Sequence, residues 1–377
     1  MKNKTNILIC GDICPTQDTH KFFEANDVDS LFNDTLPLLK NADILIGNLE
    51  FVLTDNCNKA TKTGPILQGN NRYINIFKSL NFTALSLANN HIKDCGPDGV
   101  LDTLSICQKN NIKTVGAGKN EKQAKKPLII EKNGWRIGIM AFAEHEFNAA
   151  YENEAGANLF DLYEDFDRIK ELKKQVDYLI ILNHGGIEYY KYPSPLLQKK
   201  CRKMIDSGAD YVVNQHSHVI GTEEDYKHGK ILYGQGNTLF GYRPFQPLWN
   251  QGLLIKISLS KDNVLVENIP IKTTEKGNIN FMKEDEKERL LNKMENDKNL
   301  IINNEFVKKS WENFCNEKES LYLPLLLGKS RYFNILNRLT NNRLIKLLYS
   351  SKKLRIVKNL LRCESHLEVV NTILSEK

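Results

Sequence analysis

The residues best suited to chemistry are carboxylates, amides and imidazoles that each follow a short apolar run. Oxygen ligands and imidazole nitrogens together suit a borderline divalent metal such as Mn, Fe or Zn. A bound ion of this kind activates water and polarises the bond to be broken. The candidate residues are Asp12, Glu50, Asn90, His91, His184, His216 and His218.

These candidates are far apart in the sequence, so five predicted strands must bring them together. In open α/β sheets, ligands bind outside the carboxyl ends of the strands, and each candidate lies just past such an end. We therefore expect convergence at one sheet edge; the alternative is that each candidate is an ordinary polar loop residue. Continuous apolar runs typical of strands buried on both faces occupy 6–10, 43–46, 83–87, 177–182 and 210–213.

The stretches between these runs have helical spacing, for example at 99–110 and 159–174. Alternation of strand and helix is typical of a layered α/β fold. Two further segments, 127–142 and 252–271, read as antiparallel hairpins, the first around an Asn-Gly turn. The sequence therefore predicts an α/β protein with a mixed sheet.

Composition limits the class of protein. The chain has 377 residues, a formal charge of +6 and 41% hydrophobic residues, which excludes a largely disordered chain. No apolar run approaches the roughly 18 residues that span a bilayer. The composition shifts toward Asn, Lys, Glu and Leu near residue 275. We therefore expect one domain over 1–275 and a basic, helical C-terminal region over 276–377.

The N-terminus and the cysteines bear on the cellular compartment. The apolar stretch 7–10 is too short for the core of a signal peptide. The eight cysteines form no CxxC pair, and in a long chain without a signal they read as reduced thiols. The resulting expectation is a cytoplasmic protein, with peripheral contact at the inner membrane face as an option.

Six blocks of glycine, acidic, amide and histidine residues follow one another in a distinctive order: Gly11-Asp12, Gly47–Glu50, Asn89–Gly96, Asn183–Tyr189, His216–Val219 and Tyr233–Asn237. Together they resemble the CapA family of poly-γ-glutamate capsule-synthesis proteins, a branch of the calcineurin-like metallophosphoesterase superfamily. The resemblance covers about residues 6–271. It implies a calcineurin-like, metallophosphatase-like fold for the first domain.

The resemblance also implies a role for each candidate residue. One or two divalent ions would be bound, with Glu50 in the place of a bridging carboxylate. His91 would donate a proton to the leaving group, because it matches the histidine of the superfamily's Asn-His block. The implied metal ligands are Asp12, Glu50, Asn90, His184, His216 and His218.

The sequence departs from the superfamily pattern at several positions. Cys14 stands where a histidine is usual, and it is either a ligand for a soft metal or, as we favour, a buried thiol. Asn48 and Glu50 replace aspartates of the second block, and Gln215 precedes His216. Fewer anionic ligands favour one tightly held ion, or a second ion that is held weakly.

Five neighbours of the candidate ligands could orient them or contact substrate. Glu188 and Tyr189 follow His184 closely, although a helix-terminal acid and a packing aromatic are equal alternatives. Asn89 and Asp94 belong to the block around His91, where Asp94 suits a turn. Asn237 ends a strand and either lines the cleft or caps a turn.

The stretch 329–362 contains ten Lys and Arg residues and no acid, with leucines at helical spacing. This pattern predicts amphipathic helices. Three interpretations remain open: an anionic membrane surface, an acidic polymer or protein partner, or a helical subdomain with a solvated basic face. Nucleic acid is not expected, because aromatic residues are sparse.

Two classes of function fit these observations. The first is a metal-dependent phosphoester hydrolase in the biosynthesis of a capsule or surface polymer, either poly-γ-glutamate or polysaccharide. The second is a non-catalytic polymer-binding or assembly component that works with other capsule-synthesis proteins. A variant of the first keeps the metal but cleaves or transfers amide bonds of a poly-γ-glutamate-like chain. The expected ligand is an anionic polymer or a phosphorylated substrate.

Overall fold

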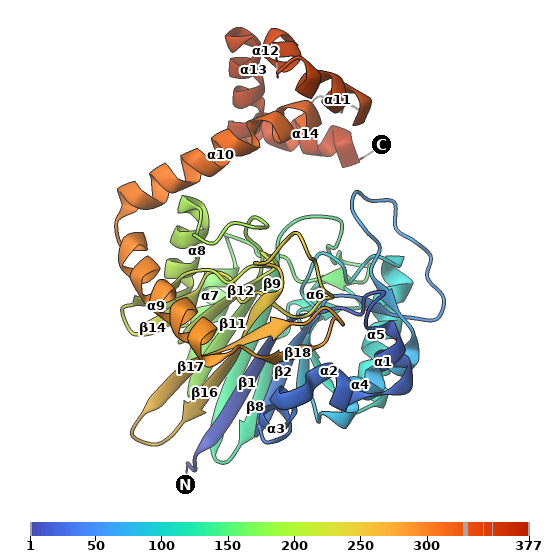
Figure 1. Ribbon diagram of the computed structural model, residues 1–377, viewed down its shortest axis with the longest axis vertical. Helices are drawn as coiled ribbons and strands as arrows, with labels where there is room; N and C mark the ends of the chain where they lie inside the picture. Colours follow the sequence, from blue (N-terminus) through green and yellow to red (C-terminus); the bar gives the residue numbers. More distant parts are fainter. Residues whose placement is uncertain (1, 327–330, 342, 349, 376–377) are drawn as a thin grey trace. The chain divides into compact units, whose positions relative to one another are not determined.

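The computed structural model describes residues 2–326, 331–341, 343–348 and 350–375 (Figure 1). Its contacts divide the chain into two compact units, Met1–Lys308 and Lys309–Lys377. The first unit contains every strand of the described residues and all of the candidate metal ligands. Each unit is described by itself below.

The first sheet of the larger unit has eight strands in the described residues and follows the order β18-β17-β16-β1-β2-β5-β6, with β15 also pairing with β1. The pairs β1-β2, β2-β5, β5-β6 and β1-β15 are parallel, whereas β16, β17 and β18 are antiparallel to their neighbours. The strands are β1 Thr5–Ile13, β2 Ile44–Leu49, β5 Ala84–Ser86, β6 Lys113–Val115, β15 Asn237–Leu239, β16 Gln251–Leu259, β17 Val264–Thr273 and β18 Ile279–Phe281.

The second sheet has the order β13-β14-β12-β11-β9-β8 in the described residues. Its central strands β9, β11, β12 and β14 are parallel, and the two outer pairs are antiparallel. The strands are β8 Leu128–Lys132, β9 Trp135–Ala143, β11 Tyr178–His184, β12 Tyr211–Gln215, β13 Glu223–Tyr226 and β14 Gly229–Leu232. Two small pairings join β3 Val52–Leu53 to β4 Gln68–Gly69 and β7 Ala117–Gly118 to β10 Gly156–Ala157.

These strands confirm the predicted α/β fold with mixed sheets. All five predicted apolar runs form strands, because both faces of each run are buried. In β11, Ile180 belongs to the core that also contains Ile9 of the first sheet, whereas Ile181 faces a second core. The two sheets therefore pack face to face. Both predicted hairpins are also present, and Asn133 and Gly134 have the positive φ angles that an Asn-Gly turn requires.

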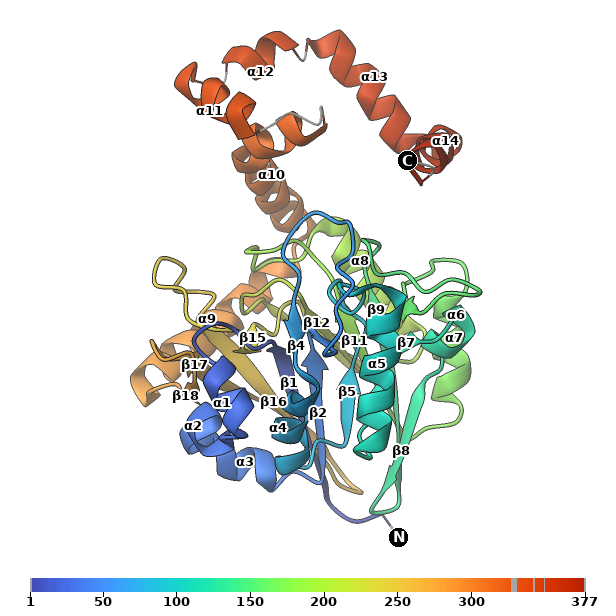
Figure 2. The ribbon, with the colours of Figure 1, turned by 90° about the vertical axis from the view of Figure 1, so that its right-hand side faces the viewer.

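Helices cover the outer faces of the two sheets (Figure 2). Helices α7 and α8 pack on the second sheet through the second core. The predicted helices at 99–110 and 159–174 correspond to α5 and α7. The helices are α1 His20–Ala25, α2 Val28–Phe32, η1 Asn33–Thr35, α3 Leu36–Lys40, η2 Asn71–Tyr73, α4 Ile74–Ser79, α5 Gly96–Lys109, α6 Glu121–Ala124, α7 Asp165–Lys173, α8 Pro195–Asp206 and α9 Glu284–Ile301.

The larger unit continues beyond residue 275, where the composition changes. Strand β18 adds to the first sheet, and Met294 and Ile301 of α9 are buried in the two cores. Because most residues of this stretch are polar, its composition does not reveal the few apolar residues that anchor it to the cores. The compact unit consequently ends at Lys308.

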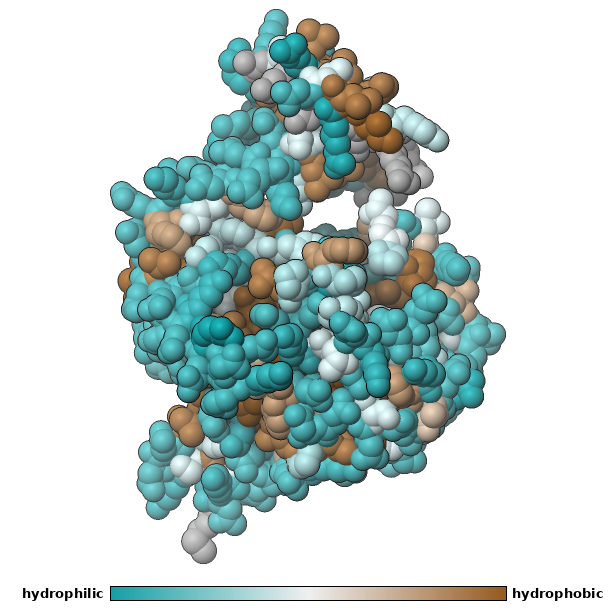
Figure 3. Space-filling view, in the orientation of Figure 1, coloured by the Kyte–Doolittle hydropathy of each residue, from teal (hydrophilic) through white to brown (hydrophobic). Residues whose placement is uncertain are grey.

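The smaller unit, Lys309–Lys377, is helical in its described residues. Five of the ten basic residues lie in α13, and all five are exposed. Several leucines are exposed as well, such as Leu339 and Leu347, so both apolar and hydrophilic residues lie on this surface (Figure 3). Lys329 lies outside the described residues. The helices are α10 Asn304–Leu326, which begins in the larger unit, α11 Arg331–Leu339, α12 Arg343–Leu348, α13 Ser351–Arg362 and α14 Glu364–Ser375.

No helix in the described ranges has both the length and the apolar composition required to cross a membrane.

Cys57 and Cys95 form a disulfide bond across 38 residues of sequence. The expectation that all eight cysteines are reduced is therefore wrong for this pair. Its Cα atoms are only 4.8 Å apart because the loop after β3 returns to the start of α5. The spacing of cysteines along the sequence could not show this proximity. Disulfides persist mainly in oxidising compartments, so this pair does not support the expectation of a reducing cytoplasm.

Candidate metal centre

The candidate residues meet where the carboxyl ends of the two sheets lie side by side. In the first sheet, Asp12 is in register with Asn48 on one side and with Asn237 on the other. In the second sheet, His184 is in register with Gln215, the residue before His216. Strand register therefore brings distant segments to one place, as predicted for ligands at strand ends.

Asn48 joins the two sheets at this point. Its Nδ2 donates to Oδ1 of Asp12 at 2.7 Å and lies 3.1 Å from Nδ1 of His184. Its Oδ1 accepts from Nδ2 of Asn89 at 3.2 Å. All four side chains are buried. The amide thus holds an acid of one sheet beside a histidine of the other.

Two groups of side chains could each hold a cation, and Glu50 belongs to both. The first is Glu50, His184 and His216, and the second is Asp12, Glu50 and His218; within each, the ligand atoms lie within 4.8 Å of one another. All of these residues are buried. Glu50 therefore offers its carboxylate to both sets of ligands. These acidic and histidine clusters suggest metal binding.

The carboxylate of Glu50 has no ordinary partner. Both of its oxygens are buried, and no hydrogen-bond donor reaches either one among the described residues. Nδ1 of His216 is buried in the same way. Nε2 of His184 lies 3.6 Å from Oε1 of Glu50, beyond hydrogen-bond distance. Because an unpaired buried carboxylate is costly, this environment fits a bound cation.

Burial shifts the pKa values of these groups in the direction that favours their neutral forms. It raises the pKa of Glu50 well above its usual range, and the nearby Asp12 adds to the rise. It lowers the pKa of His184 well below its usual range, assisted by His216. The pKa of His218 falls to about 3, again mainly through burial. Neutral imidazoles are the form that binds metals.

His91 lies next to this cluster and is paired with Asp94. Its Nδ1 is 2.7 Å from Oδ2 of Asp94, and both side chains are buried. Asp94 also accepts from Nζ of Lys62 at 2.5 Å and from the backbone N–H of Leu67 at 2.7 Å. Lys62 is itself 2% exposed at its side chain. These contacts fix the orientation of the imidazole.

The amides named in the sequence analysis also contact the cluster. Oδ1 of Asn90 is 3.0 Å from Nε2 of His184. Asn89 accepts from the backbone N–H of His91 at 3.1 Å and thereby shapes that loop. Oδ1 of Asn237 is 2.9 Å from Nδ1 of His218. Asn237 therefore lies against a candidate ligand rather than only in a turn.

The backbone is unusual at the same place. His216, His218 and Tyr189 have φ angles of +84°, +56° and +63°, values that residues other than glycine rarely adopt. The backbone N–H of Tyr189 donates to the carbonyl of Ser217 at 2.9 Å, which ties the two loops together. Strained backbone of this kind concentrates at functional sites.

Cys14 and Glu188 take less direct positions. Cys14 is buried, its Sγ contacts the carbonyl of Pro15 at 3.4 Å, and burial raises its pKa well above the usual range. It belongs to neither candidate cation group. The interpretation as a buried thiol fits this environment. Glu188 contributes to raising the pKa values of Glu50 and of its neighbour Tyr189.

Several residues at the site were not selected from the sequence. Asn48 was noted only as a departure from the pattern, although its place in the Gly47–Glu50 block was a usable signal. Lys62 and Glu146 lie in loops without a recognisable motif, and Glu146 approaches Asn90 and His216 at 3.5 and 4.0 Å. No sequence signal could have found these two, because only the folded loops bring them near.

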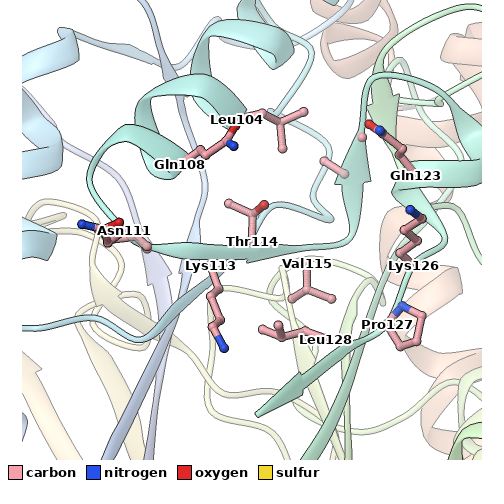
Figure 4. A pocket seen from close by; sticks show the side chains of 13 residues that line it. Leu104, Gln108, Asn111, Lys113, Thr114, Val115, Gln123, Lys126, Pro127 and Leu128 are labelled. Carbon is pink, nitrogen blue, oxygen red and sulfur yellow. The ribbon is translucent and has the colours of Figure 1, made fainter.

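A separate pocket of about 720 Å³ opens between β6 and β8. Figure 4 shows the side chains of the 13 residues that line it, including Lys113 and Lys126. None of these described residues is Asp, Glu, His or Cys. The pocket shares no residue with the candidate metal centre, which is defined by its ligand chemistry.

Comparison with protein families assigns the chain to a known family. The family model of the bacterial capsule synthesis protein PGA_cap matches residues 6–242, a stretch that contains every candidate ligand. The chain belongs to this family. The PGA biosynthesis protein CapA of Bacillus subtilis (strain 168) is 34% identical over 234 residues, which cover 61% of this chain and 62% of that protein.

The capsule biosynthesis protein CapA of Bacillus anthracis is 31% identical over 247 residues, which cover 63% of this chain and 60% of that protein. The matches thus span about three fifths of the length of these two relatives. The family assignment confirms the predicted resemblance to CapA proteins of capsule and poly-γ-glutamate biosynthesis.

Solved structures with a similar arrangement of elements include a phosphatase from Mycoplasma pneumoniae, with a TM-score of 0.47 and 14% identity over 72% of this chain and 95% of that one. Another is a 5'-nucleotidase precursor from Thermus thermophilus, with a TM-score of 0.40 and 16% identity over 79% of this chain and 60% of that one.

Proposed function

We propose that this CapA-family protein is a metal-dependent hydrolase of phosphoesters in the synthesis of a capsule or surface polymer. The observation that supports this most strongly is Glu50, a fully buried carboxylate without a donor among the described residues and shared by two sets of ligands.

In this proposal one or two divalent ions of the Mn, Fe or Zn type are held by Asp12, Glu50, Asn90, His184, His216 and His218. A bound ion supplies Lewis acidity and lowers the pKa of coordinated water. Asn48 and Asn237 orient Asp12 and His218 through the hydrogen bonds described above. Partners of this kind typically change metal affinity or activity by about 10- to 100-fold.

His91 is the proposed proton donor. Asp94 accepts from Nδ1 of the ring, which directs Nε2 away from the carboxylate. The proton on Nε2 would pass to the oxygen of the leaving group. General acid catalysis by a positioned histidine contributes about 10²–10⁴-fold to the rate.

The polymer itself is part of the proposal. The names of the relatives place those proteins in capsule and PGA biosynthesis, and we extend this context to the present chain together with capsule-synthesis partners. Two alternatives share the same fold. One is amide cleavage or transfer on a poly-γ-glutamate-like chain by the same metal centre, and the other is polymer binding without chemistry.

The test is metal analysis of the purified protein, followed by turnover of p-nitrophenyl phosphate and bis-p-nitrophenyl phosphate with added Mn²⁺. We expect near-stoichiometric metal, and we expect His216→Ala to remove both metal and turnover. His228→Ala is the matched control, because His228 is exposed and outside the cluster. It should change neither quantity.

The outcomes separate the alternatives. Turnover that persists in His216→Ala would refute the metal centre. Bound metal without turnover of either phosphoester, combined with release of glutamate from a γ-linked oligomer, would favour the amide reaction. Bound metal without any turnover would favour a polymer-binding protein.

We also propose that the C-terminal helices contact an anionic membrane surface. In α13, Lys352, Lys353 and Arg355 are exposed, and none of them forms an ion pair within the described ranges. Each basic residue near an anionic surface contributes about 1 kcal/mol. We expect Lys352→Glu with Lys353→Glu to weaken binding to phosphatidylserine vesicles at least ten-fold, with neutral vesicles as the control. Unchanged binding would dismiss this role.

A further inference from the structure

We propose that Arg243 forms a binding subsite for an oxyanion group of the substrate, a carboxylate or a phosphate, beside the metal centre. The inference rests on the proposed function, because it names the chemical class that the same site takes. Arg243 directly follows the stretch 6–242 matched by the family model, so the match assigns it no role. The support comes from the contacts of this side chain.

The guanidinium group lies over an aromatic ring. Its central carbon lies 3.2 Å from the centroid of the Trp249 ring, a close cation–π contact. Its Nη1 donates to Oη of Tyr189 and to Oε1 of Gln246, both at 3.0 Å. The head group is therefore fixed by three neighbours, although the residue is partly exposed to solvent.

The backbone of Arg243 is fixed as well. Its N–H donates to Oδ1 of Asn250 at 2.8 Å, and Nδ2 of Asn250 donates back to the carbonyl of Arg243 at 2.8 Å. Asn250 is buried. A side chain held at both ends loses little freedom when a ligand binds, which increases its contribution to affinity.

The supports of Arg243 are also contacts of the metal centre. The ring of Trp249 lies 4.3 Å from the ring of His218, centroid to centroid, and Trp249 is buried. Tyr189 is tied through its backbone N–H to Ser217, between the two candidate histidine ligands. The guanidinium is thus one aromatic ring away from His218. A group bound there would belong to the same substrate molecule as the reacting group.

Apart from its contact with the Trp249 ring, the charge of Arg243 has no partner of opposite charge within 4.0 Å among the described residues. Among the described residues, no carboxylate forms an ion pair with it, and neither Nε nor Nη2 has a hydrogen-bond acceptor. In contrast, Arg202 and Arg168 pair with Glu224 and Asp165. A planar guanidinium with two free donors matches the geometry of a carboxylate or a phosphate. The position and the unpaired charge together indicate an anion receptor.

The test is equilibrium binding, by titration calorimetry, of two probes to the full-length protein: inorganic phosphate and a γ-linked glutamate oligomer. We expect Arg243→Met to weaken binding of at least one probe about ten-fold or more. Arg243→Lys should be intermediate, because an ammonium keeps the charge but lacks the planar fork. The matched control is Arg136→Met, which removes an exposed arginine near the start of β9 and should leave both affinities unchanged.

Weaker binding of phosphate alone identifies a phosphate group as the ligand, and weaker binding of the oligomer alone identifies a carboxylate. Unchanged affinity of Arg243→Met for both probes would overturn the inference, as would a wild-type protein that binds neither. Arg243→Lys keeps the test valid if Arg243→Met does not fold. Binding can be measured without turnover. If the wild-type protein had no phosphoesterase activity and Arg243→Met still weakened binding, the proposed function would be refuted and the subsite would stand.

Discussion

Two regions of this molecule contain many ionisable groups, which are buried in one region and exposed to solvent in the other. At the candidate metal centre, Asp12, Glu50 and His184 are buried, and their polar atoms lie within a few ångströms of one another. In α13, Lys352 and Lys358 are exposed and have no ion pair in the part of the chain that the structure describes. Buried charges interact strongly and depend on one another, whereas solvated charges act almost independently.

The difference arises from the elements that carry the residues. Strands of two packed sheets end at one place, and the polar side chains that follow them are buried there. A helix with one apolar face leaves its basic face in solvent at every turn. Substitutions in the first region should therefore have large effects on metal binding and turnover. Substitutions in the second should have small effects on stability.

The largest effect is expected for Glu50→Gln. The substitution removes the shared carboxylate while keeping the size of the side chain, and both sets of ligands lose one anionic member. We expect turnover of p-nitrophenyl phosphate to fall about a thousand-fold, equivalent to about 4 kcal/mol of transition-state stabilisation. Bound metal, measured by mass spectrometry of the digested protein, should fall as well.

Glu154→Gln is the control for this experiment, because Glu154 is exposed and lies outside the cluster. It should retain full turnover and metal. If Glu50→Gln kept its metal and at least half of the wild-type rate, Glu50 would not be a ligand, and the contrast between the two regions would lose its main example.

The second largest effect concerns the disulfide that anchors the loop carrying Lys62. Cys57→Ser opens a link across 38 residues of sequence. We expect the free energy of unfolding to fall by about 3–4 kcal/mol, because the unfolded chain regains the freedom that the link removed. Urea denaturation followed by circular dichroism measures this change. Cys315→Ser is the control and should be neutral, since this cysteine is exposed and forms no disulfide among the described residues.

Addition of a reductant should lower the stability of the wild-type protein by the same amount and leave Cys57→Ser unaffected. A wild-type protein with equal stability in both conditions would show that the two sulfurs are not bonded in solution.

The sequence predicted the strands better than it predicted the site. Runs such as 177–182 are apolar on both faces, so their pattern indicates buried strands and locates the polar residues at their ends. The orientation of Asn48 between the sheets depends on register, which a sequence pattern does not fix. Lys62, Cys57 and Arg243 come from loops, whose paths are set by contacts with distant segments. The spacing of residue types along a short segment does not predict those contacts.

A third test compares cysteines, which occur in both regions. Burial raises the pKa of Cys107 to about 12 and that of Cys201 to about 11. In the helical unit, a hydrogen bond with the Ser365 hydroxyl lowers the pKa of Cys363 below its usual value. Because the thiolate is the reactive form, Cys363 should react with iodoacetamide at pH 8 about a hundred-fold faster than either buried thiol.

Mass spectrometry of peptides from a time course gives these rates. The difference should disappear in concentrated urea, where all three thiols are exposed. Equal rates in the native protein would mean that the packing of the larger unit does not protect its cysteines.

The smallest effect is expected for single lysines of α13. Lys352→Ala and Lys358→Ala should each change the free energy of unfolding by less than about 0.5 kcal/mol, and their effects should add, because each side chain is solvated. Lys62→Ala is the informative counterpart: it removes the ammonium that pairs with the buried Asp94 and should cost about 3 kcal/mol. Urea denaturation of the three variants compares them directly. If Lys352→Ala were as destabilising as Lys62→Ala, the basic face of α13 would be packed against a partner group, and its surface could not be open to a membrane.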